Sequence, residues 1–177
     1  CSELYFLDFS SIFTVVVVPF QHLIYQWERE IRKFNYTKII RAFGNKNLYL
    51  SSLDSIIFDY NIGVRNKIAV ITTYSTASKN FFLERINKIK NNLFGIFDEC
   101  HYSGSKVFSK ILVENFSGRV GLSATPSRWL DEEGTNTIFS FFQATIFSFP
   151  LSQAIKENFL TKYEYYPVLT ELTEKEQ

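Results

Sequence analysis

Apolar residues follow two patterns along this chain, short continuous runs and a helical spacing. Residues 12–19 (IFTVVVVP) form an unbroken run rich in β-branched side chains, which is typical of a parallel strand covered on both faces. In residues 21–34, apolar side chains such as Ile24, Trp27 and Ile31 are three or four positions apart, which predicts an amphipathic helix. The rest of the chain alternates between strand and helix in the same way.

The later elements are predicted from the same two patterns. Continuous apolar runs predict strands at residues 38–43, 67–74, 93–98, 119–123 and 145–149, and an edge or exit strand at 163–169. Helical spacing predicts helices at residues 48–60, around Phe82, Ile86 and Ile89, at 107–112 and at 151–160, with a polar loop at 127–135. Strands alternating with helices of this length imply right-handed crossovers and a parallel sheet. We therefore predict one α/β domain over residues 1–177.

Composition excludes some classes of protein and leaves others open. A hydrophobic content of 46% and a charged content of 21% over 177 residues are ordinary for a soluble globular domain and exclude a disordered tail. The high aromatic content, 18%, is interpreted as core packing rather than base stacking. A net charge of +1 does not indicate a polyanionic partner, although a local basic face would not show in that total.

Cysteine use and apolar run length bear on location. Cys1 and Cys100 are almost a chain length apart, which predicts neither a zinc site nor a disulfide framework and favours a reducing cytoplasm. The longest apolar run, residues 15–20, is too short to span a bilayer, and no charged-then-apolar leader opens the chain. We expect no membrane partner. Because the sequence contains no Met, we also expect an excised or processed segment.

The candidate chemistry lies directly after the predicted strands, because ligands of open parallel sheets bind outside the carboxyl ends of the strands. The clearest case is IFDECH at residues 96–101. A carboxylate after a buried apolar strand is costly unless it meets a cation or a hydrogen-bond network. Asp98 therefore fits a Mg²⁺ ligand, and Glu99 fits a group that orients or deprotonates an attacking water. The alternative is that Asp98 caps the following helix and His101 is an ordinary polar residue.

A second motif, GLSATP at residues 121–126, closes the next strand. The hydroxyls of Ser123 and Thr125 can bond the carboxylates or His101 and relay their state. Alone, this segment is also compatible with an ordinary exit turn. Both motifs on successive strands, in this order, favour a shared nucleotide site.

DECH followed by SATP resembles motifs II and III of superfamily 2 helicases. Residues 15–31 (VVVVPFQHLIYQWEREI) resemble motif Ia, and residues 71–78 (ITTYSTAS) resemble motif Ib. The Gln26-Trp27 pair and residues 145–160 resemble the DNA repair and restriction-type branch. That branch includes restriction-enzyme motor subunits, XPB-like helicases and RadD-like repair proteins. The resemblance covers nearly the whole chain and implies a first RecA-like motor domain, a P-loop NTPase three-layer sandwich with a mainly parallel sheet.

The resemblance implies ATP and Mg²⁺ as cofactors, with Asp98, Glu99 and His101 as catalytic residues and Asp98 as the Mg²⁺ ligand. Coupling between nucleotide and nucleic acid falls to Ser123, Ala124 and Thr125. The nucleic-acid contacts implied by motifs Ia and Ib, for which helix capping is the alternative, are Pro19, Gln21, His22, Thr73, Tyr74 and Ser75.

The remaining expectations concern the partners of the protein and the roles of an aromatic and two basic side chains. The implied partners are DNA, with RNA left open, a second RecA-like domain of the same parent chain, and a nuclease or restriction subunit. Trp27 lies on the apolar stripe and is interpreted as core packing. Lys79 and Arg128 are either phosphate contacts or solvated loop charges.

One departure from the family pattern is plain: the sequence contains no GxxxxGK[ST] phosphate-binding loop. Residues 1–9 (CSELYFLDF) resemble the later part of the helix that follows that loop, so we expect truncation just downstream of it and no ATP hydrolysis by this piece alone. A non-catalytic binding module with a retained motor fold is the rival hypothesis, which the intact Asp98-Glu99 pair disfavours. A third hypothesis is another class of P-loop ATPase, and the Ser-Ala-Thr-Pro segment disfavours it.

Overall fold

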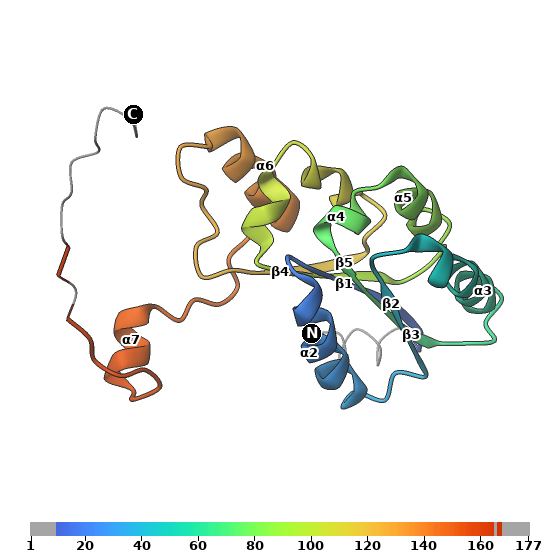
Figure 1. Ribbon diagram of the computed structural model, residues 1–177, viewed down its shortest axis with the longest axis horizontal. Helices are drawn as coiled ribbons and strands as arrows, with labels where there is room; N and C mark the ends of the chain where they lie inside the picture. Colours follow the sequence, from blue (N-terminus) through green and yellow to red (C-terminus); the bar gives the residue numbers. More distant parts are fainter. Residues whose placement is uncertain (1–9, 165, 168–177) are drawn as a thin grey trace. The chain divides into compact units, whose positions relative to one another are not determined.

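Five parallel strands form one sheet in the computed structural model, which describes residues 10–164, 166 and 167 (Figure 1). The strand order is β2-β3-β1-β4-β5. The bounds are β1 (Ile12–Val18), β2 (Lys38–Ala42), β3 (Lys67–Thr73), β4 (Leu93–Asp98) and β5 (Gly118–Leu122). Every pair of neighbours is parallel, so the prediction of an α/β fold with a parallel sheet is confirmed.

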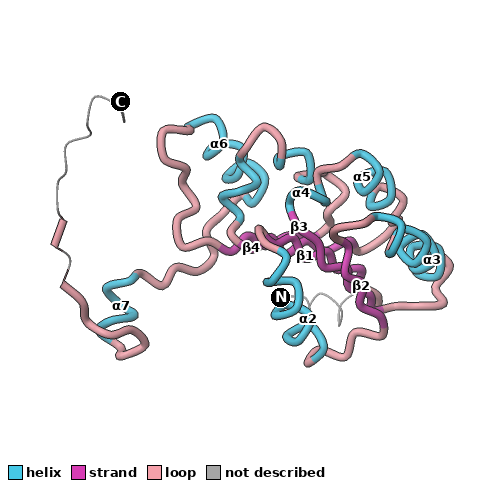
Figure 2. Tube along the Cα trace, viewed as in Figure 1, coloured by secondary structure: helices cyan, strands magenta, loops and turns pink. Residues whose placement is uncertain are grey.

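Helices cover both faces of this sheet (Figures 1 and 2). One face carries α2 (Gln21–Arg32), and the other carries α3 (Leu50–Asn61), α4 (Tyr74–Ala77), α5 (Asn80–Ile86) and α6 (Glu132–Phe142). Short 3₁₀ turns are η1 (Lys46–Leu48), η2 (Cys100–Gly104) and η3 (Phe108–Ile111), and the chain continues through α7 (Leu151–Lys156). The fold therefore has three layers, and a hydrophobic cluster lies between the sheet and the helices on each of its faces.

The central strand β1 shows why its sequence is continuously apolar. All seven of its residues are buried, since it lies between β3 and β4 and is covered on both faces. Phe13, Val15 and Val17 join the cluster under α3 and α5, whereas Ile12 and Val16 join the cluster under α2. Burial of each such side chain stabilises the fold by roughly 1.5–3 kcal/mol. The sheet is thus a rigid base for the loops that leave its carboxyl edge.

Strand β5 differs from β1 in its burial. Its residues are half-buried or exposed, and β4 is its neighbour within the described part of the chain. The register sets Asp98 of β4 opposite Leu122 of β5. The DECH and SATP segments therefore leave the sheet side by side.

The structure corrects the predictions made for the C-terminal region. Residues 145–149 form no strand, and Ile146 and Phe147 are 77% and 79% exposed. An apolar run becomes a strand only where a neighbour completes its backbone hydrogen bonds, and no strand of the described residues pairs with this run. The helix predicted at 151–160 ends at Lys156. The described residues of 163–169 form no strand, and the others lie outside the described residues, as do residues 1–9.

Two predictions between β4 and α7 also need correction. The polar loop predicted at 127–135 already contains the start of α6, because Asp131 caps the helix and accepts a hydrogen bond from the Gly134 N–H (2.8 Å). Glu132 and Glu133 follow in the first turn, where they favour the helix dipole. The helix predicted at 107–112 is a single 3₁₀ turn, η3.

The chain separates into two compact units, Cys1–Ala144 and Thr145–Gln177, and the sheet belongs to the first. In the second, the rings of Phe149 and Phe159 pack edge to face with centroids 5.7 Å apart. Within the described residues, no helix is both long and apolar enough to cross a membrane.

Candidate active site

Asp98, the last residue of β4, is held by hydrogen bonds from two directions. Side chains alternate along a strand, so Asp98 lies on the same face as Phe94 and Ile96, the face covered by α2. The indole Nε1–H of Trp27 on α2 donates to Oδ2 (2.8 Å), and the backbone N–H of Glu99 donates to Oδ1 (3.1 Å). Each carboxylate oxygen keeps a lone pair for a further partner.

The backbone turns sharply at Glu99, directly after Asp98. Glu99 has φ 47° and ψ 54°, in the left-handed region, which costs a non-glycine residue about 1–2 kcal/mol. Its Oε2 lies 3.3 Å from Nδ1 of His101, and the same nitrogen lies 3.0 Å from Oγ of Ser123. The backbone N–H of Thr125 also donates to that Oγ (3.1 Å). The loops after β4 and β5 are therefore joined through His101, and the coupling role of Ser123 and Thr125 stays a prediction.

A thiol and a phenol are buried beneath the acidic pair. Cys100 is a free cysteine, and burial, followed by the nearby Glu99 carboxylate, raises the pKa of its thiol to about 11. Burial likewise raises the pKa of Tyr74 far above its ordinary value. The Tyr74 hydroxyl donates to the backbone carbonyl of Asp98 (3.0 Å), and its ring stacks on Tyr102. Both groups are therefore neutral at neutral pH, and Tyr74 supports the Asp98 backbone through its hydrogen bond.

Arg128 clamps the loop after β5 onto the DECH segment. Its Nη1 donates to the carbonyl of His101 (2.6 Å), and its Nε donates to Asp131 (2.6 Å). The hydrogen bond from Arg128 and the one from the Gly134 N–H lower the pKa of Asp131. A Cβ added at Gly104 would lie 2.5 Å from Cδ of Arg128 and 2.6 Å from the Gly134 carbonyl, so glycine permits this close approach. Arg128 is thus paired and half-buried rather than a solvated loop charge, and a phosphate contact by it stays a prediction.

The candidate nucleic-acid residues after β1 lie at the exposed start of α2 and in the short turn before it. Gln21 and His22 are exposed, and Pro19 is half-buried. The residue that precedes α2, Phe20, provides no side-chain cap, and its ring stacks on His22 with centroids 5.8 Å apart. The Leu23 N–H donates to the Phe20 carbonyl (3.2 Å), which leaves the N–H groups of Gln21 and His22 for another acceptor.

The candidates after β3 are arranged differently. Ser75 is exposed. Thr73 is buried and accepts a hydrogen bond from the Thr76 N–H (3.4 Å), so the capping alternative applies to it. Tyr74 is 1% exposed, which places its side chain away from any polymer surface.

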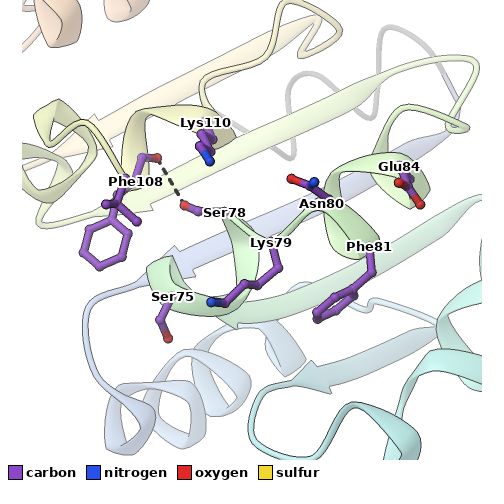
Figure 3. A pocket seen from close by; sticks show the side chains of 9 residues that line it. Ser75, Ser78, Lys79, Asn80, Phe81, Glu84, Phe108 and Lys110 are labelled. Atoms are coloured by element: carbon purple, nitrogen blue, oxygen red, sulfur yellow. Dashed lines mark hydrogen bonds between the residues drawn. The ribbon is translucent and has the colours of Figure 1, made fainter.

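An open pocket of about 630 Å³ adjoins Ser75 (Figure 3). Lys79 and Lys110 line it together with Asn80 and one acidic residue, Glu84. The Ser78 hydroxyl donates to the carbonyl of Phe108 (3.3 Å) and so joins the end of α4 to η3 beside the pocket. Two ammonium groups against one carboxylate favour an anionic occupant.

The donor set at the end of β4 fits a Mg²⁺ ion bound together with a nucleotide. Mg²⁺ prefers oxygen ligands and is usually held by one or two carboxylates, substrate phosphates and waters. Asp98 offers two oxygens with lone pairs free, and Glu99 follows it. No group of three or more His, Cys, Asp or Glu that could hold a metal occurs among the residues that the structure describes. Among the described residues, Asp98 is therefore the side chain that would hold the ion, with Glu99 beside it.

Comparison with known proteins identifies the family of this chain. A family model described as the type III restriction enzyme, res subunit, matches residues 4–128, which include all five strands and both motifs. The chain belongs to the type III restriction enzyme res subunit family. No curated protein sequence matches it. Among solved structures, a de novo designed protein of P-loop NTPase fold, determined by solution NMR, aligns with a TM-score of 0.44 and 15% identity over 75% of this chain and 90% of that one.

Membership of the res subunit family confirms the resemblance to superfamily 2 at the level of the superfamily. Two contacts in this res-family site were missed by sequence reasoning. The bond from Trp27 to Asp98 joins residues 71 positions apart and depends on the packing of α2. The clamp by Arg128 had a readable signal, because Arg128 and Asp131 are three residues apart just before a helix start.

Proposed function

We propose that this res-family chain is the nucleotide-hydrolysing part of an ATP-driven motor that moves on DNA, in a restriction, repair or phage-defence system. The observation that carries the proposal is the Asp98-Glu99 pair, held at the carboxyl end of β4 and joined through His101 to the loop after β5. Groups fixed before the reaction stabilise developing charge without reorganisation, which is the largest single source of catalysis in many enzymes.

Each residue of the pair has a distinct task in this proposal. Mg²⁺, when bound with ATP, neutralises charge on the phosphates. Asp98 would hold the ion through the oxygens that accept hydrogen bonds from Trp27 and from the Glu99 N–H. The Glu99 side chain is 43% exposed, so it reaches solvent and orients the attacking water. His101 and Ser123 transmit the state of that site to the loop after β5.

The groups that cradle the phosphates are proposed to come from outside the printed sequence, which contains no Gly-Lys-Ser/Thr. A Lys and a Ser/Thr of such a loop contact the phosphates and Mg²⁺ in P-loop proteins. A second RecA-like domain is proposed to complete the motor.

The nucleic acid is proposed to contact the exposed loop after β1 and the region after β3. Gln21, His22 and Ser75 are exposed there, and the first turn of α2 offers N–H groups to phosphate. Lys79 and Lys110, in the pocket beside Ser75, add positive charge (Figure 3). Contacts of this kind recognise the backbone and carry little sequence information.

The decisive experiment measures Mg²⁺-dependent ATP hydrolysis by the full-length protein that contains this chain. Asp98→Ala is expected to lower the rate by at least about 10²-fold, since it removes the metal ligand. Asp54→Ala is the matched control, because Asp54 is a half-exposed carboxylate on α3 that pairs with Arg85. Wild-type turnover in Asp98→Ala contradicts the proposal, and no hydrolysis by the wild type favours a non-catalytic DNA-binding module.

A further inference from the structure

Trp27 is the side chain that connects α2 to the acidic pair. Its ring packs, half-buried, against the cluster formed by α2 and the sheet, where Ile24 and Ile31 are buried. Its indole N–H donates to Oδ2 of Asp98 at 2.8 Å. The indole N–H of this half-buried ring finds its acceptor in the proposed Mg²⁺ ligand.

The bond fixes the orientation of the carboxylate. Oδ2 accepts from Trp27, and Oδ1 accepts from the backbone N–H of Glu99. With one donor on each oxygen, rotation of the Asp98 carboxyl group breaks at least one hydrogen bond. The lone pairs that remain then point in fixed directions. Loss of a side chain that hydrogen-bonds to a metal ligand typically lowers metal affinity or activity by roughly tenfold to a hundredfold.

We propose that Trp27 is a positioning residue for Asp98: it orients the carboxylate toward the metal and nucleotide without touching either. This inference rests on the proposed function of Asp98. Because α2 begins at Gln21, the same bond also joins the Mg²⁺ ligand to the helix that starts in the exposed loop.

The activity test uses the full-length protein with Trp27→Phe, which keeps an aromatic ring and removes only the N–H donor. The Mg²⁺ concentration for half-maximal ATPase is expected to rise about tenfold. Trp129→Phe is the matched control, since Trp129 is 90% exposed and its Mg²⁺ dependence should match the wild type. If Asp98→Asn is inactive while Trp27→Phe has the wild-type Mg²⁺ dependence, Trp27 has no positioning role and the proposed function stands. An active Asp98→Asn variant overturns the proposed function instead.

A second measurement leaves Trp27 in place and so does not depend on the folding of its variant. The printed chain contains two tryptophans, and their indole N–H signals can be resolved by ¹⁵N NMR. Trp27 should give a signal that exchanges slowly with water and shifts in Asp98→Asn, whereas the exposed Trp129 should exchange fast and stay in place. A Trp27 signal unchanged by Asp98→Asn overturns the inference.

Discussion

The ends of β1 and β4 differ sharply although the two strands are neighbours in one sheet. Both strands are buried and apolar, with Val17 opposite Phe97 near their carboxyl ends. After β4, Asp98 is bonded to a residue 71 positions earlier and His101 to one 22 positions later. After β1, Gln21 and His22 are exposed and α2 starts without a side-chain cap.

The difference between the two strand ends matches the needs of two different kinds of site. A hydrolytic centre needs groups held within a fraction of an ångström, so its side chains are bonded to several other elements. A surface that meets a sliding polymer needs accessible donors, each of which acts almost independently. The same sheet edge thus provides a preorganised site beside an open one.

The largest effect is expected where packing holds the end of β4. Gly104→Ala would place a Cβ 2.6 Å from the Gly134 carbonyl, which cannot move cheaply, and 2.5 Å from Arg128. We expect a loss of about 1–3 kcal/mol in the free energy of unfolding, measured in urea, together with reduced ATPase. Gly63→Ala is the control, because nothing lies within 4 Å of the added Cβ. The positive φ of 77° should lower the free energy of unfolding, whereas the ATPase should be unchanged. Unchanged stability and ATPase in Gly104→Ala would show that the clamp is not tightly packed.

A smaller effect is expected at the link between β4 and β5. Ser123→Ala removes the hydroxyl that lies 3.0 Å from His101. Such a hydrogen bond contributes about 0.5–1.5 kcal/mol, which corresponds to a factor of roughly three to ten. We expect the distance moved on DNA per ATP consumed to fall by that factor. Ser127→Ala is the control, because Ser127 is an exposed serine of the same loop. Normal movement per ATP in Ser123→Ala contradicts the relay.

The smallest effects are expected after β1. Gln21→Ala and His22→Ala should each weaken oligonucleotide binding by about twofold to threefold, and the double variant by the product. Fluorescence anisotropy at two salt concentrations measures both the affinities and the salt dependence. A strongly non-additive double variant would show that this loop is as tightly coupled as the end of β4, and the comparison would fail.

Much of the fold could be predicted from the sequence because buried strands leave a strong pattern. The run at residues 93–98 was located with both ends correct, since every residue before Asp98 is buried. The run at 145–149 has a similar composition and forms no strand, because composition does not reveal whether a neighbouring strand exists. The Asp131 cap was overlooked among polar residues that also suit a loop.

The site was predictable only where it follows strand order. His101 and Ser123 follow the neighbouring strands β4 and β5, so their proximity could be expected from a parallel sheet. The partnership of Trp27 with Asp98 depends on how α2 is rotated over the sheet, which an apolar stripe does not specify to one side chain. Burial of Tyr74 was also hidden, because a polar residue after a strand is equally compatible with a surface.

Glu99→Gln provides the most direct test of the central claim, that the acidic pair after β4 hydrolyses ATP. In the full-length protein, this change keeps the size of the side chain and removes its charge. Mg-ATP should still bind, as measured by calorimetry, while turnover falls by at least about 10²-fold. Glu114→Gln, an exposed glutamate before β5, should behave as the wild type. Wild-type turnover in Glu99→Gln would contradict the account.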